Sequence, residues 1–489
     1  MKLIKLYVPY FIIMMFMLLI LLSCQKGTKI IVYKIETNPF SSDPQNYDYF
    51  IHHSIYRSVL GTLVSNYNST EVKGVLAESW KNSENDKVWE FSLRENLYFS
   101  NGDKITSEII IQSLKRIFLL LKRNGSKGDF FNYLNGIEKL NDLDDEIEGL
   151  RLKQGKILFV FKRSMPDFLE KISFGLYSIV HPSNYDKDSL EWQSELNVVS
   201  SYTYKIEKIN SQNFELGLNE HFNLELGPEN KFEKVIISWD EDIKPDIYEG
   251  NSLEDNKKKK EFSFSGGVES GISFIRCHSW DVDGSICSKL EDRMMLRNSL
   301  LNFLKNNGHN ITTSFFPKGM KGLDQQEFPV EEHEINEGLL NYKLATRNFS
   351  NKKTKLWNSI ESFFTKFTNR ENKNDISMRV FFEEMDSEKR TADFIGIDTG
   401  ILIDRPIDDV KFMINSTAGI RIPDMNGKLK KLASEEEVDV NQINKEIWDQ
   451  AIIWPIAHFT SGLFSKSFVD LNKLNLIQPP IDFTWVGKK

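Results

Sequence analysis

The sequence predicts an α/β fold with more than one domain. The chain has 489 residues, and domains of about 100–200 residues are typical, so the length allows about three domains. Strand-like and helix-like patterns alternate along the chain, which favours an α/β architecture. Hydrophobic residues make up 40% and charged residues 27% of the sequence, a composition typical of globular domains with sizeable cores.

The N-terminus resembles the signal peptide of a bacterial lipoprotein. Two lysines precede an almost wholly apolar run from Leu6 to Leu22, and Leu21-Leu22-Ser23-Cys24 resembles a lipobox. A small residue before the cysteine gives a peptidase access, and the Cys24 thiol accepts a diacylglycerol. The alternative is an uncleaved membrane anchor, but the run is interrupted by Pro9 and is shorter than the ~20 residues of a spanning helix. Residues 1–23 are predicted to be removed.

Gln25 bears on the destination of such a lipoprotein. In bacteria with two membranes, retention at the inner membrane commonly uses aspartate after the cysteine, so glutamine resembles the outer-membrane default. The sequence therefore predicts a protein of the cell envelope, anchored by lipid on a periplasmic or other extracytoplasmic face, and the choice of membrane stays open.

The clearest local pattern runs from residue 88 to residue 121. Trp89, Phe91 and Leu93 alternate with polar residues, which predicts a strand with one buried face. Asn101-Gly102 predicts a turn. Thr106 stands where its hydroxyl can cap a helix, worth about 1 kcal/mol. Apolar residues then recur at helical spacing and predict one buried helix face, formed by Ile110, Leu114, Ile117 and Leu121.

Further elements follow from the same kind of pattern. Residues 30–33 and 272–275 predict strands, residues 55–64 predict a helix ending at Gly61, and Gln154-Gly155 predicts a hairpin turn. The stripe of Leu296, Leu300 and Leu304 predicts a helix that Gly308 ends. Residues 334–345, 352–367 and 377–382 predict two helices and a strand, whereas the polar residues 241–270 predict a variable loop.

The order of several short motifs resembles extracellular solute-binding protein family 5. This family includes the oligopeptide- and dipeptide-binding lipoproteins of ABC transporters. The matching motifs are LAESW at 76–80, WEFSLREN at 89–96, FSNGDKIT at 99–106 and SLKRI at 113–117. Asp43-Pro44, Met165–Leu169, the helix entry Asp292–Leu301 and the loop Ser314–Met320 resemble later landmarks, so the resemblance covers nearly the whole mature chain.

This resemblance implies a two-lobed periplasmic-binding-protein fold of type II, in the large peptide-binding class, with an extra N-terminal subdomain. It implies a discontinuous lobe I from residues 24–49, 175–270 and 455–489, and a lobe I subdomain from residues 50–174. Lobe II would comprise residues 271–454. The two lobes would close on an oligopeptide or a similar solute, and the protein would work as a monomer with the permease and ATPase subunits of an importer.

The resemblance also implies ligand-contacting residues. In relatives, the segment before the Asp-Pro pair lines the ligand cleft, and Asn38 to Phe40 match it here; the alternative is an ordinary surface turn. An acid in a later strand can pair with the α-amino group of a peptide, and Asp398 is the matching position. Because the family's tryptophan is replaced by Ile397, an exposed loop acid remains the alternative reading of Asp398.

Cys277 and Cys287 are the cysteines that remain if Cys24 is acylated. An oxidising compartment permits a disulfide between them, with a gain of about 2–3 kcal/mol for so short a loop. Two unpaired cysteines are the alternative. Beyond the pair Cys277-His278, the residues around them do not have the ligand spacing of a zinc site.

The chain departs from the family pattern in three places: residues 200–203, 241–270 and 396–410. Residues 200–203 lack both glycines and the proline of a Gly-x-Gly-Pro-Tyr segment that relatives carry, and glycine would permit backbone angles that other residues avoid. These departures, together with Gln25, motivate an alternative function in which a binding protein of this fold acts as a surface receptor or sensor without feeding transport.

Several other functions lack the residues they require. The formal charge of −8 and the short basic run Lys257–Lys260 do not predict nucleic-acid binding. His333-Glu334 begins a zinc-protease motif, but position 337 is glutamate. The sequence contains neither a phosphate-binding P-loop nor a nucleophile elbow. We therefore expect neither an enzyme nor a cofactor, and uptake energy would come from separate subunits.

Overall fold

The computed structural model describes most of the chain in sixteen stretches. These are residues 29–35, 43–44, 53–65, 72–123, 130–222, 224–253, 261–317, 323–324, 327–332, 344–347, 354–366, 374–376, 392–400, 427–434, 439–474 and 481–489. The chain divides into two compact units. Unit 1 runs to Tyr248 and includes 465–475 and 480–489, and unit 2 comprises Glu249–Phe464 with 476–479. The predicted lobe boundaries stay a prediction.

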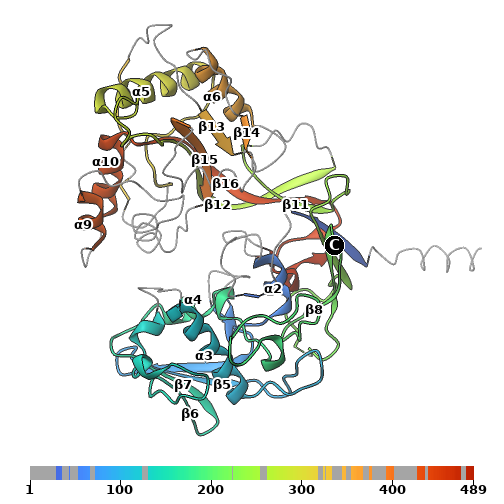
Figure 1. Ribbon diagram of the computed structural model, residues 1–489. Coiled ribbons are helices and arrows are strands. Elements are labelled where there is room, and N and C mark those ends of the chain that lie inside the picture. Colours follow the sequence, from blue (N-terminus) through green and yellow to red (C-terminus); the bar gives the residue numbers. More distant parts are fainter. Residues whose placement is uncertain are drawn as a thin grey trace, which may run out of the picture. The chain divides into compact units, whose positions relative to one another are not determined.

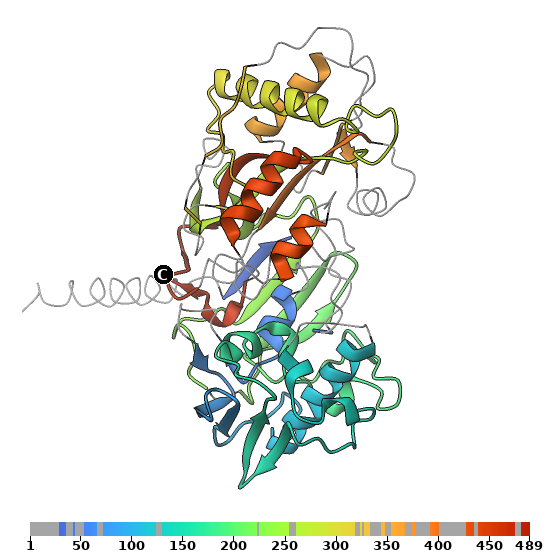
Figure 2. The same ribbon diagram turned by 90° about the vertical axis from the view of Figure 1, so that its left-hand side faces the viewer.

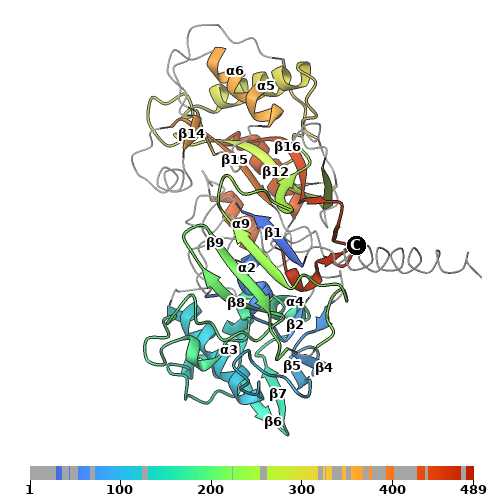
Figure 3. The same cartoon turned by 90° about the vertical axis from the view of Figure 1, so that its right-hand side faces the viewer.

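Unit 1 contains a mixed sheet with the strand order β11, β1, β10, β9, β8 (Figure 3). The strands are β1 (Ile30–Lys34), β8 (Tyr204–Ile209), β9 (Asn213–Leu218), β10 (Lys234–Ser238) and β11 (Ile247–Asn251). β1 runs parallel to β10 and β11, whereas β10, β9 and β8 are antiparallel. Ile31 and Tyr33 are fully buried, so the predicted strand at 30–33 is confirmed.

A second sheet in unit 1 carries the pattern that was clearest in the sequence. Its order is β4, β5, β7, β6. The strands are β4 (Ala77–Ser83), β5 (Val88–Leu93), β6 (Leu150–Lys153) and β7 (Lys156–Val160). Trp89 and Phe91 are buried and alternate with less buried residues, as predicted. Phe168 at the start of α4 (Phe168–Ile172) packs against the rings of Phe91 and Phe159.

Helix α3 (Ser107–Arg123) covers this second sheet (Figure 1). Thr106 caps it as predicted, because the Ile109 N–H donates to the Thr106 hydroxyl at 3.4 Å. Its apolar side is buried at Ile110, Leu114 and Ile117. Glu108 in the first turn and Lys122 in the last turn complement the helix dipole.

Two turns in this sheet differ in how easily their residues adopt left-handed backbone angles. Gln154 and Gly155 have φ of 52° and 77° between β6 and β7, which confirms the predicted hairpin turn. Between β4 and β5, three consecutive non-glycine residues have φ of 55°, 53° and 61°; they are Glu84, Asn85 and Asp86. The β4–β5 turn therefore holds local strain, because such angles favour glycine.

Unit 2 contains a sheet with helices on both faces (Figures 1 and 2). Its strand order is β14 (Asn374–Ile376), β13 (Leu344–Arg347), β15 (Phe394–Gly400), β12 (Phe262–Cys277) and β16 (Ile453–Lys466). Ile272 and Phe274 of β12 share a core with α9 (Lys428–Ser434) and α10 (Val440–Gln450). Ile275 and Cys277 of the same strand share the other core with α5 (Leu290–Asn306) and α6 (Lys355–Lys366).

The predicted variable loop at 241–270 was wrong for part of its length. β11 occupies 247–251, and β12 begins at Phe262 rather than near residue 272. Glycine is uncommon inside strands, so Gly266 argued against a strand here. The structure requires glycine at this position, because an added Cβ would lie 2.6 Å from the Thr460 side chain. The strand therefore needs a glycine where propensity argues against one.

Two of the helices that the sequence predicts in unit 2 are present in the structure. The helices at 292–304 and 352–367 are confirmed as α5 and α6. Gly308 has φ of 75° beyond the end of α5, as predicted. The expected strand at 377–382 lies wholly outside the described residues. So does most of the expected helix at 334–345, and its described end is wrong, because residues 344 and 345 begin strand β13.

Two arginines of the helix-entry motif hold the C-terminal end of α10. Arg293 donates to the Gln450 carbonyl at 3.1 Å, and Arg297 donates to the Trp448 carbonyl and stacks 3.5 Å from the centre of the Trp448 ring. Both arginines are buried. They bring positive charge to the negative end of α10, which stabilises it.

Short elements complete the two units. They are α2 (His53–Val59), β2 (Val64–Ser65), β3 (Lys73–Gly74), β17 (Val469–Asp470), β18 (Gly487–Lys488) and the 3-10 turns Phe130–Tyr133, Ile137–Lys139, Gly175–Tyr177, Pro182–Asn184 and Phe483–Trp485. The predicted helix at 55–64 is α2, which ends at Val59 rather than at Gly61. Within the described ranges, every helix is too short or too polar to cross a bilayer.

Candidate functional site

The predicted site residues fall into two groups. Cys24, Asn38 and Phe40 lie outside the described residues. Asp398, Cys277 and Cys287 lie in unit 2. The described part of the chain contains no group of three or more residues that could hold a metal ion.

Asp398 lies near the end of strand β15 and is half-buried. The indole Nε1 of Trp357 on α6 donates to its Oδ2 atom at 2.9 Å. Asp398 pairs across the strands with Ser273 of β12, whose side chain is fully buried. The bond from Trp357 therefore orients a carboxylate that can also accept hydrogen bonds from a cationic group.

In unit 1, the aspartate of the Ser-Asp-Pro motif pairs with a buried arginine. Arg116 of α3 donates to both carboxylate oxygens of Asp43, at 3.1 and 2.8 Å. The Arg116 side chain is fully buried and that of Asp43 is 11% exposed. Such a bidentate pair fixes both position and orientation.

The remaining donors of Arg116 are also used. Its Nε and Nη2 atoms donate to the carbonyl oxygen of Leu190 at 3.1 and 2.8 Å, and Leu190 has φ of 66°. The guanidinium carbon lies 4.9 Å from the ring centre of Tyr185 and 5.5 Å from that of Trp192. Asp43 is thus held in place after the predicted ligand segment 38–40. Ile35 is held before that segment, because its N–H donates to the Ser238 carbonyl at 2.8 Å.

In the stretch 200–203, which departs from the family pattern, the Ser201 hydroxyl and the Ser200 backbone N–H form hydrogen bonds, whereas the buried Ser200 hydroxyl has no hydrogen-bond partner among the described residues. Ser201 donates to the carbonyl of Ile179 at 2.6 Å and accepts from the N–H of Gly61 at 3.0 Å. The Ser200 N–H donates to the Ser100 hydroxyl at 2.9 Å. Ser200 and Ser201 are fully buried, so this stretch is part of the core of unit 1.

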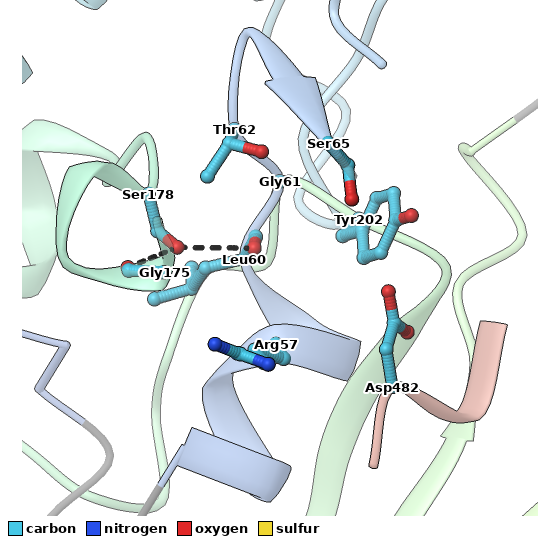
Figure 4. Close-up of a pocket in the computed structure, with 9 residues that line it drawn as sticks. All are labelled: Arg57, Leu60, Gly61, Thr62, Ser65, Gly175, Ser178, Tyr202 and Asp482. Carbon is cyan, nitrogen blue, oxygen red and sulfur yellow. Dashed lines mark hydrogen bonds between the residues drawn. The ribbon is translucent and has the colours of Figure 1, made fainter. Parts of the chain in front are cut away.

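Sequence reasoning missed a small polar cavity in unit 1 (Figure 4). Its volume is about 10 Å³, close to the room that one water molecule needs. The lining residues are Arg57, Leu60, Gly61, Thr62, Ser65, Gly175, Ser178, Tyr202 and Asp482. They come from stretches far apart in the sequence, so no local pattern could have predicted the cavity.

Asp482 is the most unusual group at this cavity. It is 2% exposed, and its Oδ1 atom accepts from the Thr484 N–H at 2.9 Å. Burial raises the pKa of Asp482 to about 6, although the bonds from Thr484 and the charge of Arg57 act in the opposite direction. Burial, followed by the charge of Asp482, raises the pKa of Tyr202 well above its ordinary value. The sequence signal is Asp-x-Thr, a pattern typical of a turn capped by the aspartate.

Comparison with protein families agrees with the arrangement in unit 1. Residues 71–242, which include the second sheet and α3, match the model for bacterial extracellular solute-binding proteins, family 5. The match is to this stretch, about a third of the chain. Family 5 consists of substrate-binding proteins, and the match begins just before the motif that the sequence analysis singled out.

Two curated relatives match the chain over limited lengths. A probable D,D-dipeptide-binding periplasmic protein of Escherichia coli is 43% identical over 49 residues, which is 10% of each chain. The dipeptide-binding protein DppE of Bacillus subtilis is 25% identical over 173 residues, covering 35% of this chain and 31% of the relative. The chain thus matches a tenth and under a third of these relatives' lengths.

Solved structures show that the same fold extends over almost the whole chain. The murein tripeptide binding protein MppA of E. coli aligns over 94% of this chain and 99% of its own, with a TM-score of 0.68 and 16% identity. Haemophilus influenzae OppA, in complex with the peptide RPPGFSPFR, aligns over 95% and 99%, with a TM-score of 0.68 and 14% identity. The predicted α/β fold class is confirmed.

Proposed function

We propose that this chain is the extracytoplasmic substrate-binding lipoprotein of an ABC importer and that it captures oligopeptides or a similar solute. The family match over residues 71–242 carries the proposal. The fold of peptide-binding proteins, which extends over 94% of the chain, supports it. In this proposal separate permease and ATPase subunits supply transport and energy.

The contacts of Asp398 support a peptide as the ligand. A half-buried carboxylate that is oriented by the Trp357 indole can pair with the ammonium group at a peptide's N-terminus. A hydrogen bond to a charged group contributes about 1.5–3 kcal/mol. The proposal assigns the N-terminal amino group of the ligand to Asp398, and backbone contacts near Asn38 and Phe40.

The test uses a soluble Cys24→Ser form without residues 1–23. Native mass spectrometry of the protein as purified would find peptides released on activation. Calorimetry would then compare a bound peptide with its N-acetylated form. We expect acetylation to weaken binding by about tenfold or more, because it removes the charge that Asp398 meets.

The Asp398→Asn variant separates the role of this residue from the function of the protein. It should bind the free and the acetylated peptide with similar affinity. The matched control is Asp449→Asn, which changes an acid of α10 that pairs with Lys445 and should leave the preference intact. If a peptide binds the wild type equally well with and without acetylation, Asp398 does not bind its amino group. Peptide binding by the protein would still be established.

Lipid anchoring at Cys24 needs its own test. Cells that express the full chain would be fed a radiolabelled fatty acid such as palmitate. Label in the wild type and none in Cys24→Ser would support the anchor, and fractionation would give the membrane. Unlabelled wild-type chain that retains residues 1–23 would instead mean an uncleaved anchor.

A departure from the family pattern favours a second candidate function. Ile397, beside Asp398, stands at a position where the family resemblance implies a tryptophan. The alternative is a ligand-binding surface receptor or sensor of the same fold that does not feed transport. Protein that carries no peptide, ignores a peptide library in thermal-shift assays and supports no peptide uptake would favour this alternative.

A further inference from the structure

The two cysteines of unit 2 are both free thiols and fully buried in the core beneath α5 and α6. Cys277 ends strand β12, where it pairs with Phe394 of β15. Its N–H donates to the carbonyl of Ile452, the residue before β16, at 2.7 Å, so the backbone of Cys277 is held on both sides.

Cys287 reaches the same place from the loop before α5. Its thiol donates to the carbonyl of Asp393 at 3.4 Å, and Asp393 immediately precedes the residue that pairs with Cys277. These contacts place the two cysteines beside the same two residues of the chain, Asp393 and Phe394. Burial and then the neighbouring Cys287 raise the pKa of Cys277 well above its ordinary value, in agreement with this placement.

The loop between the cysteines is already folded back on itself. Val282 donates from its N–H to the Ser279 carbonyl at 3.1 Å, and Ser285 donates in the same way to Val282 at 3.1 Å. The N–H of Cys287 bonds to the Ser285 hydroxyl at 3.0 Å. Arg293 of α5 holds the other side, with a bond to the Cys287 carbonyl at 2.7 Å. A bond between the sulfurs would therefore close a loop that is already ordered.

From this juxtaposition we propose that Cys277 and Cys287 form an intramolecular disulfide in the mature protein. The proposal rests on the extracytoplasmic location in the proposed function, because disulfides persist in oxidising compartments. The two thiols give up two hydrogens to the disulfide of a thiol oxidoreductase, which becomes a dithiol, and one sulfur–sulfur bond forms. The exchange balances in atoms and electrons.

Burial sets the order of events. An oxidant cannot reach sulfurs that are fully buried in the core, and burial keeps Cys277 protonated, whereas the thiolate is the attacking species. The disulfide therefore forms before the core around α5 and α6 closes. Once the unit has folded, the same burial protects the bond from added reductant.

The test is thiol labelling of the Cys24→Ser form, in which Cys277 and Cys287 are the remaining cysteines. A cleavable signal peptide replaces residues 1–23, so that the protein is exported to the extracytoplasmic compartment. It is purified without reductant, unfolded and treated with a maleimide. We expect no label, and an intact mass about 2 Da below that of the reduced chain. Dithiothreitol on the folded protein should leave it unlabelled, whereas dithiothreitol in denaturant should expose two labelled thiols.

A sample of the same variant made in a reducing cytoplasm is the matched control. We expect it to take up two labels after unfolding and to melt about 5–10 °C below the exported sample. Two labels on the exported, denatured chain would overturn the proposal. Peptide binding, measured on both samples, is a separate readout, so a free dithiol that still binds peptide would refute the disulfide and not the proposed function.

Discussion

Arg116 and Asp43 are 73 residues apart in the sequence, and each satisfies the buried charge of the other. Separating two such charges from water is costly, and only good geometry with further hydrogen bonds offsets that cost. Here the same guanidinium also donates two hydrogen bonds to the backbone carbonyl of Leu190. The motif aspartate is therefore a structural anchor for the chain that enters unit 1.

Replacing Arg116 tests this anchor. We expect Arg116→Ala to lower the free energy of unfolding by about 3–5 kcal/mol, because it leaves the Asp43 carboxylate buried without its partner. Arg116→Lys should lose less, since it keeps the charge but not the bidentate geometry. Urea denaturation followed by tryptophan fluorescence measures both. The double variant Arg116→Met with Asp43→Asn should recover much of the loss; a double variant as unstable as Arg116→Ala would contradict this account.

Asp482 should make stability depend on pH in a direction unusual for a carboxylate. Its pKa is raised in the folded protein from 3.8 to about 6. The folded state therefore binds the proton more tightly, and the stability that this proton supplies is complete below pH 3.8 and is lost as pH rises through about 6. The full difference is on the order of 3 kcal/mol.

The variant Asp482→Asn removes this dependence. We expect the difference in unfolding free energy between Asp482→Asn and wild type to rise in favour of the variant between about pH 4 and pH 6 and then to stay constant. Urea titrations at a series of pH values measure that slope, which does not depend on any fixed offset from the new amide. Parallel curves for the two proteins would mean that Asp482 is not held in its protonated form.

At the level of elements, the β4–β5 hairpin carries strain that a substitution can relieve. Glu84 is exposed and has φ of 55°. We expect Glu84→Gly to stabilise unit 1 by roughly 0.5–1 kcal/mol, because glycine adopts this angle without steric cost. The matched control is Lys87→Gly in the same turn, since Lys87 is exposed but has no positive φ. Thermal melts should show opposite shifts, and a destabilised Glu84→Gly would refute the argument.

Local patterns predicted those elements whose causes are local. The cap at Thr106, the turn at Asn101-Gly102 and the alternation of Trp89 and Phe91 each depend on residues a few positions apart. The start of β12 was missed because Gly266 is needed for its contact with Thr460, which comes from another strand. Local sequence patterns do not reveal a contact between two separate strands.

Across the whole molecule, the sequence predicted the fold class better than the site. The resemblance placed Asp398 in a strand region, but its bond to Trp357 joins residues 41 positions apart. The Phe483 N–H bonds to the Ser58 hydroxyl over 425 positions. Tertiary packing brings side chains together over such separations, and a single sequence does not reveal these contacts.

The way unit 1 is assembled from separate stretches has a consequence for the timing of folding. Its last stretch carries Asp482, and the N–H of Phe483 meets Ser58 of α2. Unit 2 is largely one continuous stretch, Glu249–Phe464. During synthesis the ribosome therefore delivers all of that stretch before unit 1 has its final partners. A chain still being made keeps unit 1 incomplete, and in the proposed function this delay would leave the polypeptide unfolded for passage through a membrane.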